Sequence, residues 1–383
     1  MEKENVRISV VREGVRSLAK EVKEASHGGR VLLFTEEGPQ GEDAAAALTF
    51  EGLQVTKKVI SRWDDDLFAE LQKPPEGFMA LVGVGGVLPI EATKAARTGN
   101  SIPKILFPCE FSALSASDDL VYLGTKGALP VAVSLGHSVL FDPDLLSASP
   151  LRPGLGHIAA ALVEEADGTY EKLLLDDQSP AAALRALKEK AALLSEIREE
   201  SVGADVARTA LTYLKLSNAS PRSLSAHTLA LLAARKTGGC FCDYLFPAAY
   251  ALFLLYTRYL GALPLEHCPP PDRAENLRLL NAKCGIEPSL FYKAQKPYLE
   301  GYDDRWMKTA EYREDFLEAL GAIAFPALSR LYRRTPHENE RSPALSASEL
   351  LMLLSLTGEA VSGYPLIKHI KMTGLIEPLL KCG

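Results

Sequence analysis

The chain has 383 residues, which is long enough for two domains that each bury a core of their own. Apolar residues make up 47% of the sequence and charged residues 24%, an ordinary composition for a globular protein. The 42 Lys and Arg residues against 49 Asp and Glu residues give a net charge of −7, so we expect no nucleic-acid partner.

Strand and helix patterns alternate along roughly the first 150 residues. We predict helices over residues 15–25, 43–50 and 66–72, and strands over 30–34, 53–60, 78–82, 102–108 and 138–141. This alternation predicts a parallel, doubly wound sheet of the Rossmann-like type, because each helix returns the chain to the start of the next strand.

The stretch Phe78–Thr98 joins a buried strand, a glycine turn at Gly83–Gly86 and a helix in direct succession. Such a turn suits an anion, since glycines let the backbone come close and a helix N-terminus presents N–H groups and a positive dipole end. The spacing is not GxGxxG, because Leu88 stands third after Gly85. Phosphate binding and a simple tight turn therefore both stay open on the spacing alone.

From Pro150 onward the pattern is helical, with almost no strand signal. We predict helices over residues 156–166, 180–199, 205–216, 223–235, 245–259, 272–283, 309–324 and 347–356, with loops at 268–273 and 334–343. The apolar stretch Leu245–Thr257 is too short for a membrane span and fits a buried helix. The sequence thus predicts an α/β domain over residues 1–149 and an all-helical domain over 150–383.

Neither the N-terminus nor the cysteines indicate export. The first residues, MEKENVR, lack the apolar segment of a signal peptide. The six cysteines are scattered, which argues against a disulfide framework: Cys109, Cys240, Cys242, Cys268, Cys284 and Cys382. We therefore expect a cytoplasmic protein without a membrane partner.

Two strings resemble the superfamily that holds dehydroquinate synthase, glycerol dehydrogenase, iron-containing alcohol dehydrogenases and glycerol-1-phosphate dehydrogenase. GVGG-VLPIEATK is similar to its GxGGGxxIDxAK turn, with Glu91 in place of Asp and Val87 in place of Gly. Val139–Ala160 is similar to its linking segment. The matching residues are Gly83, Gly85, Gly86, Ile90 and Lys94 in the first string, and Asp142, Leu145, Pro150, Arg152, Gly154 and Gly156 in the second.

The resemblance implies a dehydroquinate synthase-like architecture, a nucleotide-binding α/β domain followed by a helical domain that holds a metal. It implies NAD or NADP as cofactor, Zn or Fe as metal and a small-molecule substrate, and a homodimer would be compatible with it. The implied cofactor contacts are Gly83, Gly85, Gly86, Lys94, Pro108, Cys109 and Ser112. Leu114 stands where polyol dehydrogenases carry an Asp, and Asp118 or Asp119 would be its substitute.

The resemblance also implies metal ligands in the helical half. His157 stands where the family has a carboxylate, and His227 or Ser223 occupies the second ligand place. The third place lacks its usual His, and Cys242 or Asp243 is the nearest donor. We predict the set His157, His227 and Asp243, in which the two histidines hold a metal that polarises the substrate hydroxyl. The alternative is that these side chains are packed residues without a metal.

Three functions are compatible with these features. The preferred hypothesis is an oxidoreductase, an NAD(P)- and metal-dependent dehydrogenase of a small polyol or polyol phosphate with a diverged metal site. The second is a dehydroquinate synthase-like enzyme on a sugar phosphate. The third is a catalytically degenerate protein that binds a nucleotide or a partner. The basic stretch from Tyr292 to Lys308 fits a solvated helix face better than an anion pocket.

Overall fold

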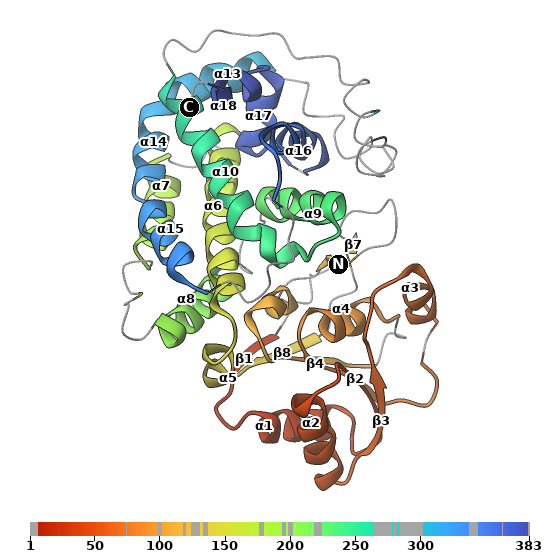
Figure 1. Cartoon of the computed structure of the whole chain (residues 1–383). Coiled ribbons are helices and arrows are strands. Elements are labelled where there is room, and N and C mark those ends of the chain that lie inside the picture. Colours follow the sequence, from red (N-terminus) through yellow and green to blue (C-terminus); the bar gives the residue numbers. More distant parts are fainter. Residues whose placement is uncertain are drawn as a thin grey trace. The chain divides into compact units, whose positions relative to one another are not determined.

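The computed structural model describes residues 7–73, 75–97, 102–117, 120–123, 131–132, 137–175, 180–193, 197, 202–217, 224–262, 278, 282, 302–336, 344–361 and 363–381 (Figure 1). The chain divides into two compact units. The first unit comprises Met1–Gly154 with Ser201–Asn218, and the second comprises Leu155–Glu200 with Ala219–Gly383. Helix α8 (Val202–Ser217) therefore belongs to the first unit, although it lies well beyond residue 149 in the sequence.

The first unit contains a six-stranded sheet in which every neighbouring pair is parallel. Its order is β1-β8-β5-β4-β2-β3. The strands are β1 (Arg7–Val10), β2 (Arg30–Thr35), β3 (Gln54–Val59), β4 (Ala80–Gly85), β5 (Lys104–Pro108) and β8 (His137–Phe141). The predicted doubly wound sheet is confirmed, and the edge strand β1 is an addition that the sequence did not reveal. A separate two-stranded pair joins β6 (Leu120–Val121) to β7 (Val131–Ala132).

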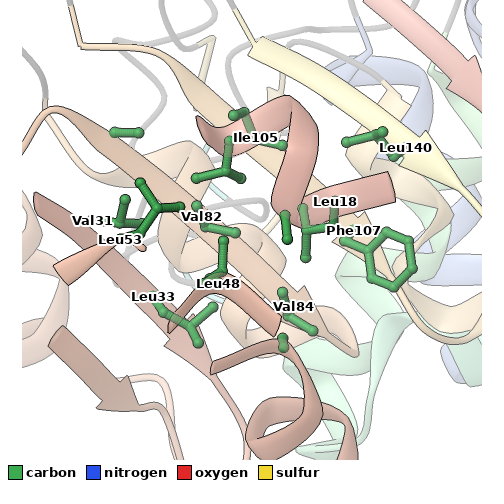
Figure 2. Packing of buried hydrophobic residues seen from close by; sticks show 14 of the residues in the cluster. Leu18, Val31, Leu33, Leu48, Leu53, Val82, Val84, Ile105, Phe107 and Leu140 are labelled. Atoms are coloured by element: carbon green, nitrogen blue, oxygen red, sulfur yellow. The ribbon is translucent and has the colours of Figure 1, made fainter. Parts of the chain in front are cut away.

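Helices cover both faces of this sheet. They are α1 (Val15–Ala25), α2 (Pro39–Phe50), α3 (Asp65–Leu71) and α4 (Val87–Ala95). Successive side chains of a strand point to opposite faces of the sheet. Val31 and Val82 therefore belong to the core that lies between the sheet and helices α1 and α2 (Figure 2). Phe34 and Leu81 join the second core, with α3 and α4. Strand β4 is buried at every residue for this reason, and its sequence is continuously apolar or glycine.

The junction of β4 and α4 is tighter than the sequence suggested. The strand begins at Ala80 and runs through Gly83 to Gly85, so only Gly86 is left as the turn before α4. A β-carbon on Gly83 would lie 3.0 Å from Cβ of Thr93 and 3.1 Å from the carbonyl oxygen of Pro89. The lack of a side chain at Gly83 thus lets α4 pack directly on β4. Gly85 has φ +129°, a conformation that residues with side chains rarely adopt.

We expect Gly83→Ala to lower the free energy of unfolding by about 1–3 kcal/mol, because its methyl group would press on the main chain of α4. Gly261→Ala is the matched control, since no atom lies within 4 Å of a β-carbon there. Urea titration followed by circular dichroism would measure both variants. Equal midpoints for Gly83→Ala and the wild type would contradict the close packing.

The described residues of the second unit are helical, as predicted. They form α6 (Leu151–Leu175, of which the first four residues belong to the first unit), α7 (Pro180–Ala192), α9 (Ser225–Thr237), α10 (Phe241–Gly261), α13 (Tyr302–Glu311), α14 (Arg313–Gly321), α15 (Phe325–Arg334), α16 (Ala347–Ala360), α17 (Leu366–Met372) and α18 (Ile376–Lys381). The helix predicted over 309–324 is two helices, α13 and α14. Apart from two isolated positions, the helix predicted over 272–283 lies outside the described residues, as do the loop 268–273 and the basic stretch up to residue 301.

Helices α9 and α10 form the interior of this unit. Residues 225–234 of α9 are all buried, and α10 buries most of its length, including Leu252 at 0% exposure. A helix that is covered on all sides can carry polar side chains only where these are hydrogen-bonded. Among the described residues, no helix is long and apolar enough to cross a membrane.

Candidate functional site

The first candidate site lies at the carboxyl edge of the sheet in the first unit. Strands β2, β4 and β5 are neighbours and run parallel, so the loops that follow them open at the same edge. The order of the sheet reverses here, because β3 lies on one side of β2 and β4 on the other. Open parallel sheets bind ligands in the crevice at such a reversal. Glu36, Gly86 and Glu110 occupy the three loops.

Both carboxylates lie against Gly86. The backbone N–H of Gly86 donates to Oε2 of Glu36 at 3.3 Å. A β-carbon on Gly86 would lie 3.2 Å from Oε1 of Glu36 and would collide with Oε1 of Glu110. The space at the N-terminus of α4 is therefore taken by two side-chain carboxylates, one from the loop after β2 and one from the loop after β5. Neither residue is among the predicted cofactor contacts.

The ionisation of Glu36 reflects this crowding. Burial, and next the negative charge of Glu110, raise the pKa of the Glu36 carboxyl, while the N–H groups of Gly86 and Leu88 act to lower it. Those N–H groups begin helix α4, so they are the donors that a bound anion would use. Glu36 thus takes up the N–H of Gly86, one of the donors that the glycine turn was predicted to offer a phosphate.

The other predicted cofactor contacts surround this edge. Pro108 ends β5, and the N–H of Cys109 donates to the carbonyl oxygen of Gly85 at 3.0 Å. Burial raises the pKa of the Cys109 thiol to about 12, so it stays protonated and is a poor nucleophile. Ser112 lies in the 3₁₀ helix Phe111–Ser117, together with a buried Leu114. Asp118 and Asp119 lie outside the described residues.

Lys94 serves inside the first unit. Its side chain is 0% exposed, and its Nζ lies 3.1 Å from Oε1 of Glu91 and donates to the carbonyl oxygen of Ser115 at 2.8 Å. The Ser115 hydroxyl donates to the same Glu91 oxygen at 3.0 Å. Glu91 and Lys94, both part of the glycine-turn string, therefore tie α4 to the 3₁₀ helix. The predicted contact between Lys94 and a cofactor would need this ammonium group. In the structure the group is instead bonded to Glu91 and Ser115.

The second candidate site lies in the helical unit, where His157 of α6 meets His227 of α9. Their ring centroids are 5.8 Å apart and their planes are inclined by 49°. The side chains are nearly inaccessible, with 6% and 4% of their surfaces exposed. Two of the three residues predicted to hold a metal are thus brought together by the fold.

Glu164, which the sequence analysis missed, fixes the position of His227. It lies two helical turns beyond His157 on α6 and is 0% exposed. Its Oε1 accepts hydrogen bonds from the backbone N–H of His227 at 3.1 Å and from ring Nδ1 at 2.8 Å. An ionised carboxylate can only accept, so this contact favours a His227 ring whose Nδ1 carries a proton. The helical spacing of His157 and Glu164 was the available signal.

Asp167 forms a second link from α6, and the sequence analysis did not name it either. Its Oδ2 accepts from the hydroxyl groups of Ser225 and of Tyr256, the latter at 3.1 Å, and its Oδ1 accepts from the N–H of Leu366 at 2.9 Å. Burial raises the pKa of the Asp167 carboxyl to about 7, although these hydrogen bonds act to lower it. One side chain therefore connects α6 to α9, α10 and α17.

The third predicted ligand does not join the histidines. Asp243 is half-buried in the first turn of α10, beside the buried Cys242. Among the residues that the structure describes, no group of three His, Cys, Asp or Glu side chains is arranged to hold an ion. Ser223 lies outside them. Since a catalytic zinc needs three protein donors, the described side chains do not fit a tightly held zinc or iron.

Solved structures match this chain along most of its length, whereas neither a family model nor a curated protein sequence matches it. An alcohol dehydrogenase from an archaeal halo-thermophilic Red Sea brine pool is 14% identical, covers 99% of this chain and 97% of its own, and has a TM-score of 0.53. Glycerol dehydrogenase from Schizosaccharomyces pombe is 16% identical, with 89% and 96% covered and a TM-score of 0.52. The iron-containing alcohol dehydrogenase from Thermotoga maritima is 12% identical, with 98% of both chains covered and a TM-score of 0.53.

These identities establish the fold and nothing finer. The chain has the fold of the iron-containing alcohol dehydrogenases and glycerol dehydrogenases, as the resemblance of its two strings implied. A fold can persist after its chemistry has changed, so activity has to be argued from the two candidate sites.

Proposed function

We propose that this chain is a catalytically silent protein that keeps the polyol dehydrogenase fold. The observation that carries the proposal is the pairing of polar groups where α6 meets α9. Glu164 holds the backbone and ring of His227, and Asp167 holds Ser225, so both carboxylates secure the first turn of α9. The carboxylates beside the two histidines of the implied metal centre thus join helices.

A structural role accounts for the burial of Asp167 and of one oxygen of Glu164. An isolated charge in a protein interior is very unfavourable, and it persists only where hydrogen bonds satisfy it. Asp167 accepts three hydrogen bonds and Oε1 of Glu164 accepts two, whereas Oε2 of Glu164 is buried without a hydrogen-bond partner among the described residues. These bonds come from α9, α10 and α17, which are separated from α6 in the sequence. The same side chains could therefore be kept for the stability of the unit without any catalytic demand.

The second candidate is the dehydrogenase, and one observation favours it. The rings of His157 and His227 are close enough to share an ion, and Glu164 contacts His227 as carboxylates contact the histidine ligands of metals. In that case the two histidines would hold zinc or iron, and NAD or NADP would take the hydride from a small polyol or its phosphate. A sugar-phosphate synthase is a less supported candidate, because acidic side chains repel a phosphate. Apart from the histidines, the residues identified at the two sites are acidic: Glu36, Glu110, Glu164 and Asp167.

Metal content separates the two candidates. We expect protein purified from zinc- and iron-supplemented cells to hold far less than one ion per chain, and we expect no NAD- or NADP-linked oxidation of glycerol. His157→Ala and His227→Ala should then leave the metal content unchanged, with folding checked by circular dichroism. His27→Ala, at an exposed position, controls for adventitious binding to surface histidines. One ion per chain that is lost in the first two variants and kept in His27→Ala would overturn the proposal.

A further inference from the structure

The turn between β4 and α4 has the backbone of an anion site. Gly85 adopts φ +129°, Gly83 lets α4 approach the strand, and the first N–H groups of α4 point out of the carboxyl edge of the sheet. The edge also lies at the reversal of strand order, where open parallel sheets hold their ligands. Shape and position alone therefore favour the pyrophosphate of a dinucleotide, as the resemblance implied.

The side chains around this turn have the opposite electrostatic character. Glu36 accepts a hydrogen bond from the N–H of Gly86 at 3.3 Å, so it occupies a donor that a phosphate would need. Glu110 closes the other side, since even a β-carbon on Gly86 would collide with its Oε1. A pyrophosphate would have to displace one carboxylate from the helix terminus and lie beside the other.

We propose that this chain excludes NAD, NADP and other dinucleotide phosphates, and that Glu36 and Glu110 are the residues that exclude them. The two carboxylates occupy the place at the N-terminus of α4 where the negative charges of the phosphates would lie. Like charges at a site that is partly shielded from water repel strongly, because the solvent screens them poorly. The inference concerns the first unit and is independent of whether the helical unit holds a metal.

An acidic residue at such an edge has another well-known use, which is to bind the hydroxyl groups of a cofactor's ribose. The two roles predict opposite effects of neutralising Glu36. If Glu36 recognises a ribose, Glu36→Gln weakens NAD binding. If Glu36 excludes the phosphates, Glu36→Gln strengthens it. The geometry favours exclusion, because the carboxylate is bonded to the N–H of Gly86 in the turn itself.

The test uses the full-length chain and compares Glu36→Gln, Glu110→Gln and the double variant with the wild type. Glu37→Gln is the matched control, since Glu37 is adjacent and exposed. Isothermal titration calorimetry at low ionic strength would measure binding of NAD, NADP and inorganic pyrophosphate. Glutamine has nearly the size of glutamate, and thermal melting would confirm that each variant folds.

We expect no binding of these ligands to the wild type or to Glu37→Gln at 1 mM ligand. A dissociation constant of about 1 mM already corresponds to weak binding. The double variant should bind inorganic pyrophosphate and both dinucleotides at least tenfold more tightly than the wild type. Micromolar binding of NAD by the wild type would overturn the proposal. It would also fail if the double variant bound pyrophosphate no better than the wild type, because the carboxylates would then not be the cause. Neither result would bear on the metal content of the helical unit.

Discussion

Leu252→Asp is expected to unfold the helical unit. Leu252 is 0% exposed on α10, which packs against α9 and α14. The new carboxylate would be desolvated without a partner, and the loss of the leucine side chain would leave a cavity. Together these effects should cost about 4 kcal/mol or more, a large fraction of the stability of a typical domain. Circular dichroism with urea titration would measure the loss.

Leu252→Met is the matched control for this substitution. It keeps the volume and the apolar character of the side chain, so we expect a cost below about 1.5 kcal/mol. A soluble Leu252→Asp variant with the melting curve of the wild type would show that this face of α10 is exposed, against the structure.

Asp167→Ala should be the most damaging change to the polar interior of the helical unit. It removes three hydrogen bonds and leaves donors from Ser225, Tyr256 and Leu366 buried without their acceptor. Each unsatisfied buried donor costs about 1–3 kcal/mol, so we expect a total of roughly 3–5 kcal/mol after partial relaxation. Tyr256→Phe, which removes one donor and keeps the carboxylate, should cost only about 1 kcal/mol. Urea titration of both variants at pH 5.5 would measure these costs.

The cost of Asp167→Ala should also depend on pH. Burial raises the pKa of Asp167 from 3.8 to about 7, and Glu164 and Tyr256 are titratable groups that face it. A carboxyl whose pKa is raised by folding stabilises the protein fully below the unfolded pKa and loses that contribution as the pH rises through about 7. The stability difference between wild type and Asp167→Ala should therefore be smaller at pH 8.5 than at pH 5.5. An equal difference at both pH values would show that the pKa is not raised.

The sheet was largely predictable because its signals are local. Apolar runs between turn residues located β2, β3, β4, β5 and β8 to within a few residues. The four-residue β1 was missed, since the residues 7–10 carry little pattern of their own and become a strand through pairing with β8. Helix α6 runs from Leu151 to Leu175, well past the predicted 156–166, because the Asp167-Gly168 pair reads as a helix end, whereas tertiary hydrogen bonds bury Asp167 within the helix.

The candidate sites were predictable only in part. The strings around Gly85 and His157 pointed to both places, and the structure does bring His157 and His227 together. The carboxylates beside Gly86 and His227 were missed. Glu36 and Glu110 belong to loops far from Gly86 in the sequence, and nothing local distinguishes them from solvated surface charges.

The sequence by itself determined the fold class, the two-part order of sheet and helices, and the position of the glycine turn, because strand and helix periods and turn residues act over short distances along the chain. The tertiary structure alone decided the partners of the charged groups. Parallel strands bring the ends of β2, β4 and β5 to one edge, and packing of α6 against α9 buries Glu164 beside His227. Residues distant in the sequence therefore determine whether the glycine turn faces a bound anion or carboxylates of the same chain. The reason is that the strength of an electrostatic interaction depends on the distance in space and on burial, not on separation along the chain.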